Sequence, residues 1–420
     1  MIDIKFIREN PDAVRASQKG RGEDTSIVDQ LLKLDETRRT AITEFETLRA
    51  EQNTLSKSVG AAKGDEKTAL LANAKDLADK VKAADTKRAE IEAQVNAMAM
   101  QLSNVLDPDA PIGGEADFVV IEHVGTPRDF TKDGFEPKDH VELGKLLGAI
   151  DTERGAKVAG SRSYYLTGTG ALLEFALVNY AISSATKAGF IPVIPPVLVN
   201  PAAMEGTGFL GQAAENVYHL ERDEVYLVGT SEVPLAAYHM DEVLPADKLP
   251  IRYAGYPSCF RREAGSYGAH VRGLNRLHQF DKIEIVQIVK PEGSYEVLEE
   301  MNQYVQGLLQ KLGLHYRVLL LCGGDMGFTS AKTYDMEVWS AAQEKWLECS
   351  SVSNFETFQT TRLKCRFRNA EGKTELAHSL NGSALALPRI VASLLENYQT
   401  PEGILVPEEL VKYTGFTIIN

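Results

Sequence analysis

The chain of 420 residues is poor in features that mark several common classes of protein. Its four cysteines lie far apart with no CxxC pair, which argues against a disulfide framework and a zinc site. No window approaches the roughly 20 apolar residues of a membrane helix, and charges interrupt the first residues, so they do not resemble a signal peptide. No GxGxxG motif follows a first strand, and no GxxxxGK[ST] motif occurs, which argues against a Rossmann or P-loop nucleotide site. These absences predict a cytoplasmic protein that does not cross a membrane.

Positive charge is also scarce, since the formal net charge is −14 and the isoelectric point is about 5.2. This balance argues against a protein that coats nucleic acid, and we expect no DNA partner, although it leaves room for a local basic surface. Residues 260–286, FRREAGSYGAHVRGLNRLHQFDKIEIV, depart from the trend. They hold five Lys and Arg against three Asp and Glu, which raises the question of which anion they bind.

Residues 27–105 carry two heptad seams, in which mostly apolar residues recur every three or four positions. The first seam consists of Ile27, Leu31, Leu34, Arg38, Ala41, Phe45, Leu48, Gln52, Leu55 and Val59. The second seam consists of Leu70, Ala74, Leu77, Val81, Ala84, Arg88, Ile91, Val95, Met98, Leu102 and Val105. Gly60 and Gly64 separate the two, so the pattern predicts two antiparallel helices that project as an arm about 50–60 Å long.

The charge of this arm differs from that of the rest of the chain. Residues 27–105 hold twelve Lys and Arg against thirteen Asp and Glu, a balance of −1, which leaves −13 for the remainder. A near-neutral arm can approach a polyanion that an acidic body repels. The alternative is a coiled coil that only dimerises or acts as a spacer.

After Pro111 the heptads stop, and short strand-like runs alternate with helical ones. The expected strands cover residues 119–123, 163–166, 225–228, 283–289, 316–321 and 336–339, and a helix is expected over 170–188. Strands joined through glycine-rich turns predict an α+β domain built on a largely antiparallel sheet.

Four short motifs follow one another in this second part. They are GFIPVIPP at 189–196, GTSE at 229–232, FRRE at 260–263 and LNGSALALPR at 380–389. In this order they resemble the signature motifs of class II aminoacyl-tRNA synthetases. With the helical arm, the resemblance narrows to bacterial-type seryl-tRNA synthetases and covers essentially the whole chain. One departure is Ala384, where the family usually has glycine.

The resemblance implies an antiparallel sheet of six or seven strands flanked by helices, carried as a homodimer with GFIPVIPP at the interface. It implies an N-terminal tRNA-binding domain at 1–107, with the coiled-coil arm at about 27–105, and a class II catalytic domain at 108–420. The implied activity is that of a serine–tRNA ligase. Such an enzyme joins L-serine to ATP as seryl-adenylate, releases pyrophosphate and transfers serine to the 3′ end of serine tRNA. Whether selenocysteine tRNA is also a substrate stays open.

For the catalytic step, the resemblance implies roles for Arg261, Glu284 and Arg389. Arg261 bridges the serine carboxylate and the α-phosphate, because a guanidinium can hold two oxygens and keeps its charge. Arg389 holds the phosphate end of ATP together with Arg276, and also covers one face of the adenine. The full set implied to bind ATP is Arg261, Arg262, Glu263, Arg276, Leu277, Phe280, Glu348, Cys349, Ser350, Ser351 and Arg389. Within it, Glu263 accepts from the adenine amino group and Phe280 stacks on the ring.

Mg²⁺ is the implied cofactor, held by Glu348 and Ser351 between phosphates, as suits a cation that takes oxygen ligands. The residues implied to bind serine are Thr230, Ser231, Glu232, Arg261, Glu284 and Ser383. Glu232 and Thr230 meet the ammonium, and Glu284 meets the hydroxyl. A buried Glu284 without that hydroxyl would lack a partner, which penalises alanine and glycine.

In this family the arm binds serine tRNA, largely through shape and backbone. Two other functions remain as alternatives. One is an enzyme that activates an amino acid for a carrier protein without tRNA; relatives of that kind typically lack the long arm, and both seams are present here. The other is a coiled-coil scaffold with a degenerate synthetase domain, which predicts loss of the charged positions that are all present in this chain.

Overall fold

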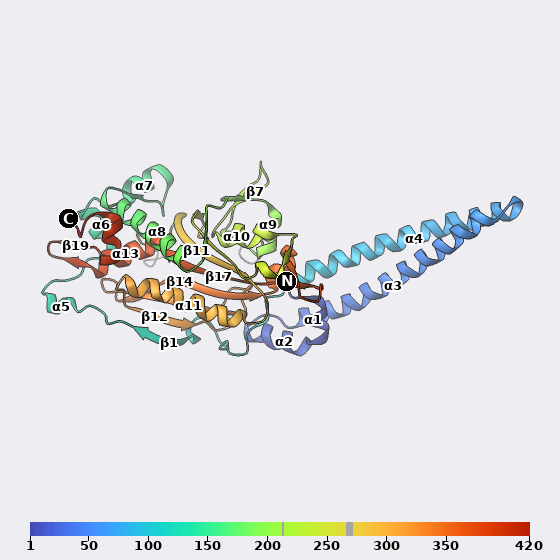
Figure 1. Cartoon of the computed structure of the whole chain (residues 1–420), viewed down its shortest axis with the longest axis horizontal. Coiled ribbons are helices and arrows are strands. Elements are labelled where there is room, and N and C mark those ends of the chain that lie inside the picture. Colours follow the sequence, from blue (N-terminus) through green and yellow to red (C-terminus); the bar gives the residue numbers. More distant parts are fainter. Residues whose placement is uncertain (212–213, 266–271) are drawn as a thin grey trace. The chain divides into compact units, whose positions relative to one another are not determined.

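The computed structural model describes residues 1–211, 214–265 and 272–420, which form two compact units, Met1–Val105 and Leu106–Asn420 (Figure 1). None of the helices formed by these residues is long and apolar enough to cross a membrane.

The first unit is helical. Its elements are α1 (Ile4–Glu9), α2 (Pro11–Gly20), α3 (Ser26–Ala61) and α4 (Gly64–Ala99). The long helices α3 and α4 run side by side as an antiparallel hairpin (Figure 1). Every residue of the two predicted seams is buried or half-buried, whereas most positions between them are exposed. The heptad pattern therefore predicted the arm correctly.

The two arginines that interrupt the seams have local partners. Arg38 donates from Nε to Oδ1 of Asp35 at 2.9 Å, and Asp35 is fully buried. Arg88 lies over the ring of Phe45, 5.0 Å from its centroid, in a cation–π contact across the two helices. The aliphatic stems of both arginines can thus cover the seam while their charges are compensated.

The second unit is built on one large sheet. Its strands, in spatial order, are β1 (Val119–Val124), β12 (Tyr316–Leu320), β13 (Lys332–Ser340), β14 (Lys345–Glu356), β17 (His378–Ala386), β11 (Gln279–Val289), β9 (Ile251–Gly255) and β4 (Ile191–Val193), with β10 (Ser258–Phe260) also paired to β11. All pairs are antiparallel except β4 with β9. The sheet has nine strands within the described ranges, so the implied six or seven was too few, because β4 adds to its end and β10 pairs with β11.

Helices and small sheets surround this sheet. The helices are α5 (Phe130–Asp133), α6 (His140–Leu146), α7 (Thr152–Ala159), α8 (Thr169–Lys187), α9 (Pro201–Thr207), α10 (Glu232–Ala236), α11 (Ser294–Lys311), α12 (Phe358–Leu363), α13 (Leu387–Asn397) and α14 (Glu408–Thr414), with 3₁₀ turns at Glu115–Asp117, Ala214–Asn216, Ala237–His239 and Ala246–Lys248. The short strands are β2 (Ile150–Asp151), β3 (Tyr165–Leu166), β5 (Leu198–Val199), β6 (Tyr218–Leu220), β7 (Val225–Leu227), β8 (Val243–Pro245), β15 (Arg366–Arg368), β16 (Thr374–Leu376), β18 (Gln399–Thr400), β19 (Gly403–Leu405) and β20 (Ile418–Ile419). The predicted runs coincide with observed strands, although 163–166 contributes only the two residues of β3, and the predicted helix is α8.

Alternation along β11 and β17 gives the sheet two different faces. Ile285 and Leu380 belong to the core that α8, α11 and α13 cover. Ala384 is in the same core and fully buried, so its methyl group packs under the sheet and does not line the cavities described below. The opposite face carries Glu284 and Asn381, and this is where the polar motifs converge.

Candidate active site

Two adjoining cavities lie on the polar face of the sheet, with volumes of about 90 and 640 Å³. They share the side chains Arg261, Arg276, Lys282, Glu348 and Ser383. The smaller cavity is lined by Arg261 and Glu263, by residues 274–277, 280 and 282, by residues 348–350 of β14, and by residues 383, 386, 388 and 389. The larger one extends over Thr230, Glu232, Glu284 and Asn381. Three of the four motifs, GTSE, FRRE and LNGSALALPR, therefore contribute to one continuous site, whereas no residue of GFIPVIPP lines either cavity.

Two buried carboxylates define the larger cavity. The side-chain amide of Asn381 donates to Glu232 Oε2 and to Glu284 Oε1, at 2.7 Å each. Thr230 Oγ1 donates to Glu284 Oε2 at 3.2 Å, and Lys282 Nζ forms an ion pair with the same carboxylate. Gln359 Nε2 donates to Glu232 Oε1 at 2.6 Å. The two carboxylates are thus held in fixed orientations with their charges partly compensated.

The protonation of Glu232 is displaced from the ordinary range. Burial, with the charge of Glu284 as the second cause, raises the pKa of Glu232 to about 7. A cation that entered this cavity would favour the ionised form. A carboxylate in this environment suits a cationic ligand, whose binding would depend on pH near neutrality.

Arg261 lies at the junction of the two cavities. Its Nε donates to Gly229 O at 3.1 Å, and its guanidinium lies over the ring of Phe280, 5.2 Å from the centroid. The backbone of Arg261 is held twice by His278, which accepts from Arg261 N through its carbonyl and contacts Arg261 O through Nδ1, each at 3.0 Å. These contacts fix the guanidinium between the carboxylate pair and the smaller cavity.

The smaller cavity is lined by cations and by an aromatic ring. Arg276 Nη1 lies 3.4 Å from Oε2 of the buried Glu263. Arg389 Nη1 donates to Glu348 O at 2.5 Å and lies 3.4 Å from Glu348 Oε2. Although desolvation opposes it, the charge of Arg389, followed by those of Arg261 and Arg276, holds the pKa of Glu348 below its usual value. A cavity that combines guanidinium groups with a phenyl ring suits a nucleotide.

Oxygen atoms gather where β13 and β14 face the larger cavity. Asp335 pairs with Ser351 across these strands, and both line the cavity with Glu337 and Glu348. Burial, and next the charge of Glu348, raises the pKa of Asp335, whose Oδ1 is buried with no hydrogen-bond partner in the described part of the chain. Within that part no three His, Cys, Asp or Glu side chains form a metal-ligand group. The donor set fits a cation such as Mg²⁺, which takes one or two protein oxygens and completes its shell with phosphate and water.

The predicted residues differ in how close they lie to this site. The smaller cavity is lined by Arg261, Glu263, Arg276, Leu277, Phe280, Glu348, Cys349, Ser350 and Arg389, and the larger one by Thr230, Glu232, Glu284, Ser351 and Ser383. Ser231 is fully buried behind Thr230, and Arg262 is exposed outside both linings. Cys349 is buried, with its thiol 3.3 Å from Met336 O, and Ser350 Oγ donates to Ser383 O.

Sequence reasoning missed three residues of the carboxylate network: Lys282, Asn381 and Gln359. Two of them had a signal. Lys282 precedes Glu284 by two positions in a strand and so shares its face, and Asn381 belongs to the last motif. Gln359, on α12, carried none, because only the fold brings it to Glu232.

Family models match both parts of the chain. The seryl-tRNA synthetase N-terminal domain matches residues 1–106, and the class II tRNA synthetase core domain for G, H, P, S and T matches residues 217–398. The chain is 53% identical over 416 residues to serine--tRNA ligase 1 of Streptomyces avermitilis, and equally so to the serine--tRNA ligase of Streptomyces coelicolor, covering 99% of this chain and 98% of each relative. The chain belongs to the seryl-tRNA synthetase family.

A solved structure of the family has the same fold. The seryl-tRNA synthetase of Pyrococcus horikoshii, complexed with ATP, is 36% identical and superposes with a TM-score of 0.93 over 100% of this chain and 99% of that one. For this member of the family, the predicted fold and family are therefore confirmed.

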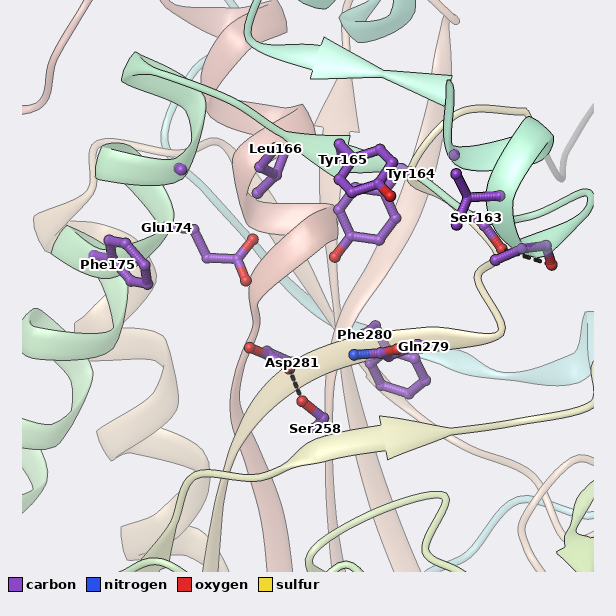
Figure 2. A pocket seen from close by; sticks show the side chains of 14 residues that line it. Ser163, Tyr164, Tyr165, Leu166, Glu174, Phe175, Ser258, Gln279, Phe280 and Asp281 are labelled. Carbon is purple, nitrogen blue, oxygen red and sulfur yellow. Dashed lines mark hydrogen bonds between the residues drawn. The ribbon is translucent and has the colours of Figure 1, made fainter. Parts of the chain in front are cut away.

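A further cavity of about 460 Å³ lies between α7, α8 and β11 (Figure 2). The carboxyl group of Glu174 points into it, facing Asp281, whose own carboxylate accepts from Ser258 Oγ at 2.7 Å and Tyr256 OH at 2.9 Å. Glu174 is 8% exposed, and its Oε2 has no hydrogen-bond partner within the described ranges. Burial, and next the charge of Asp281, raises the pKa of Glu174 to about 7.

This displacement predicts how stability depends on pH. Because the folded-state pKa of Glu174 is raised, the folded protein binds a proton that the unfolded chain releases above about pH 4.5, so stability falls as pH rises from there to about 7. Glu174→Gln should remove this loss. We expect the variant to exceed the parent by about 2 kcal/mol at pH 8 and to show no such gain at pH 4, below the unfolded-state pKa, as measured by denaturant unfolding. An equal effect at both pH values would contradict the assignment.

Proposed function

We propose that the chain is a serine–tRNA ligase, which activates L-serine with ATP and transfers it to the 3′ end of serine tRNA. The observation that carries this proposal is the carboxylate pair joined by Asn381, placed next to Arg261 and a cavity lined by guanidinium groups and a phenyl ring, in a member of this family. Both curated relatives described above are named serine--tRNA ligases.

The carboxylate pair supports a specific seat for serine. Glu232, with Thr230 next to it, would hold the ammonium group, and Glu284 would accept from the hydroxyl. Asn381 orients both carboxylates at once, and Ser383 lies opposite Glu284 in the β11–β17 pairing. A substrate without the hydroxyl would leave a buried polar group unpaired, which selects strongly against alanine and glycine. Threonine keeps the hydroxyl, so only steric exclusion of its additional methyl group would disfavour it, and the discrimination would be weaker.

Arg261 would bring the two reacting anions together. Since Gly229 O holds its Nε, its terminal nitrogens would bind the serine carboxylate and the α-phosphate. The attack of the carboxylate on phosphorus passes through a five-coordinate arrangement of higher charge density, and a preorganised guanidinium stabilises it without covalent participation. No side chain of the protein needs to act as a nucleophile.

The smaller cavity supports ATP as the second substrate. Phe280 would stack on the adenine beneath Arg389, and Glu263 would accept from its amino group. Arg276 and Arg389 would meet the phosphate end, and Leu277, Cys349 and Ser350 form the wall. Mg²⁺ would be held by Glu348 and Ser351, where it neutralises phosphate charge and favours the departure of pyrophosphate.

The first unit supports tRNA recognition. We assign the tRNA-binding role to residues 1–107 and catalysis to residues 108–420. The arm formed by α3 and α4 carries exposed lysines that can meet the phosphates of double-stranded RNA: Lys57, Lys75 and Lys82. Selenocysteine tRNA, which offers the same backbone chemistry, is a candidate for the same arm.

Exposed apolar side chains support a homodimer. On α8 and β4, Phe175 is 59% exposed and Ile191 is 56% exposed, and Ile194, in the predicted interface motif, is 90% exposed. β4 is also the terminal strand of the large sheet. An apolar patch next to an unpaired edge is typical of a contact surface, and a second copy of the chain would cover it.

The role of Arg261 predicts the behaviour of one variant. Arg261→Ala should lower kcat/KM for serine-dependent ATP–pyrophosphate exchange at least about 100-fold, because a preorganised charge contact at the reacting centre is worth about 3 kcal/mol. Arg222→Ala, an exposed arginine in the turn before β7, is the matched control and should keep full activity. Activity within threefold of the parent in a folded Arg261→Ala protein would remove the assigned role.

The raised pKa of Glu232 predicts a pH-dependent affinity for serine. Because the ammonium group binds the ionised form, each serine bound below pH 7 must displace a proton. KM for serine should therefore rise as pH falls below 7, approaching about tenfold per unit, while KM for ATP changes little. Glu232→Gln should raise KM for serine and flatten its pH profile. An unchanged profile in this variant would show that another group titrates.

The separation of the two units predicts the effect of removing the arm. Replacing residues of about 30–102 with a short flexible linker should leave pyrophosphate exchange near normal and abolish the charging of serine tRNA. In the intact protein, tRNA binding should weaken with salt, because each neutralised phosphate releases counterions. The fluorescence of Trp339 and Trp346, both outside the arm, checks the fold of the second unit. Normal charging by the armless protein would make the arm a spacer, whereas exchange without charging by the intact protein would favour the carrier-protein alternative.

A further inference from the structure

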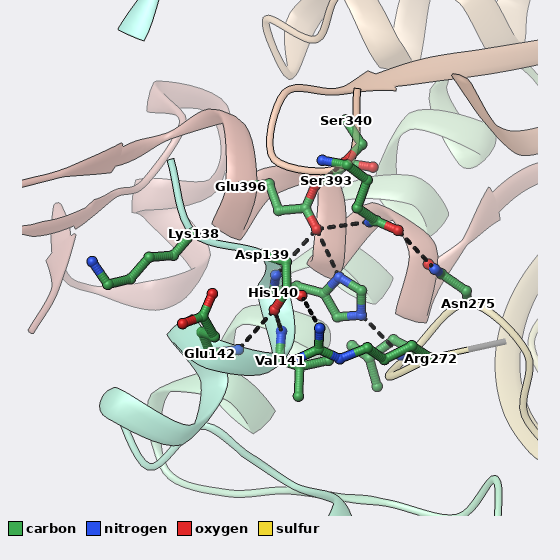
Figure 3. A network of polar contacts seen from close by, with 12 residues as sticks. Lys138, Asp139, His140, Val141, Glu142, Arg272, Asn275, Ser340, Ser393 and Glu396 are labelled. Atoms are coloured by element: carbon green, nitrogen blue, oxygen red, sulfur yellow. Dashed lines mark hydrogen bonds and ion pairs between the residues drawn. The ribbon is translucent and has the colours of Figure 1, made fainter. Parts of the chain in front are cut away.

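Two buried ionisable residues lie next to the nucleotide cavity without lining it. His140 is in the first turn of α6 and is 1% exposed, and Glu396 is in the last turn of α13 and is fully buried (Figure 3). They contact each other through His140 Nδ1 and Glu396 Oε1 at 2.7 Å. None of the roles derived above uses either residue.

The carboxylate of Glu396 fixes the hydrogen-bonding direction of its neighbours. It faces His140 N at 3.1 Å, His140 Nδ1 at 2.7 Å, Gln343 Nε2 at 2.9 Å and Ser340 Oγ. Because an ionised carboxylate only accepts, the proton of the imidazole must sit on Nδ1. Nε2 is then an acceptor, and it receives the backbone N–H of Leu274 at 3.0 Å.

A second relay starts at the same carboxylate. Gln343 donates to Glu396 through Nε2, so its Oε1 accepts from Asn275 Nδ2 at 3.3 Å. The backbone carbonyl of the same residue, Asn275, accepts from Arg389 Nε at 3.4 Å. The two relays therefore end on consecutive residues, Leu274 and Asn275, directly before Arg276 and Leu277 of the nucleotide cavity.

The residues before Leu274 are fitted to the same helix start. Arg272 forms an ion pair of 2.8 Å with Asp139, the N-cap residue of α6 (Figure 3). Gly273 has φ +65°, and a Cβ added there would lie 2.2 Å from His140 Nε2. The imidazole thus occupies the space of a side chain, and only glycine fits this position without a shift.

We propose that His140, oriented by Glu396, is a positioning residue for ATP binding: it holds the segment 272–277 so that Arg276 and Leu277 face the nucleotide. This inference rests on the proposed function for its substrate. It assigns no chemical step to His140, because the imidazole would touch neither ATP nor serine. Its effect should therefore be a change in the binding of ATP that spares the binding of serine, since Glu232 and Glu284 are held by separate contacts.

Two substitutions separate the two hydrogen bonds of the ring. In His140→Gln the amide oxygen can reach the position of Nε2 and accept from Leu274 N, whereas in His140→Asn the amide nitrogen can replace Nδ1 and donate to Glu396. Positioning through Leu274 predicts that H140N raises KM for ATP in pyrophosphate exchange about five- to tenfold, and that H140Q raises it less than half as much. KM for serine should change less than twofold in both. If His140 only stabilised the fold by donating to Glu396, H140Q should raise KM for ATP more than H140N does.

His239 provides the matched control. Its Nδ1 also contacts a carboxylate, Glu242 Oε2 at 2.8 Å, and its Nε2 contacts Tyr253 OH at 2.9 Å, outside both cavity linings. H239N and H239Q should leave both KM values unchanged. Glu396→Gln tests the same inference from the other partner. It places an amide group against the donors of His140, Gln343 and Ser340, so it should raise KM for ATP and leave KM for serine unchanged.

The proposal is overturned by an unchanged KM for ATP in folded H140N or E396Q, or by parallel changes in the KM values for ATP and serine. An H140Q that is worse than H140N also overturns it. Serine-dependent ATP–pyrophosphate exchange by the parent protein tests the proposed function separately. If the parent shows no serine-dependent exchange, the ligase assignment fails, and calorimetric Kd values for ATP on the same variants then test His140 on its own.

Discussion

The antiparallel pairing of β11 with β17 is the constraint on which the site depends. Its register places Glu284 opposite Ser383 and Val286 opposite Asn381. The amide of Asn381 can therefore reach Glu284 on the adjacent strand and Glu232 at the start of α10. A slip of one residue would turn Glu284 into the apolar core under α8, α11 and α13 and bring Ile285 to the polar face. Fold and chemistry are thus set by the same hydrogen-bond ladder.

This arrangement explains why an acidic chain gathers cations around strand β11. Burying two carboxylates in one cavity is costly, because desolvation and mutual repulsion both oppose ionisation. Lys282 and Asn381 offset part of this cost in the protein alone, whereas burial and the charge of Glu284 still raise the pKa of Glu232. Arg276 and Arg389 line the smaller cavity, where the proposed ligand would be anionic. Charge is therefore sorted in space: the buried carboxylates Glu232 and Glu284 line the larger cavity, and the guanidinium group of Arg389 lines the smaller one.

The parts of this structure that could be predicted from the sequence are those with a local period or a local motif. The arm followed from heptads, because each residue of a seam depends on neighbours three and four positions away. The Arg261, Glu284 and Arg389 set followed from motifs that resemble a known family. By contrast, Asp35 is polar and yet fully buried, since Arg38 and Arg39 from the next turn of α3 and Arg8 from α1 surround its carboxylate. Gln359 and the Glu396 relays depend on contacts across elements, for which the sequence carries no periodic signal.

Two buried polar atoms without a hydrogen-bond partner belong to residues that line the site. In the described part of the chain, buried atoms without a hydrogen bond include Asp335 Oδ1 and Asn275 Oδ1, and both residues line the site. A buried polar atom without a partner lowers stability, so a fold tolerates it best where a substrate supplies the missing partner. For Asn275 the orientation is not accidental. Glu396 obliges Gln343 to donate, Gln343 obliges the amide of Asn275 to donate in turn, and Asn275 Oδ1 is left as an acceptor at the nucleotide cavity. A single buried carboxylate can thus determine both where the segment 272–277 lies and which hydrogen-bonding group Asn275 presents to the cavity.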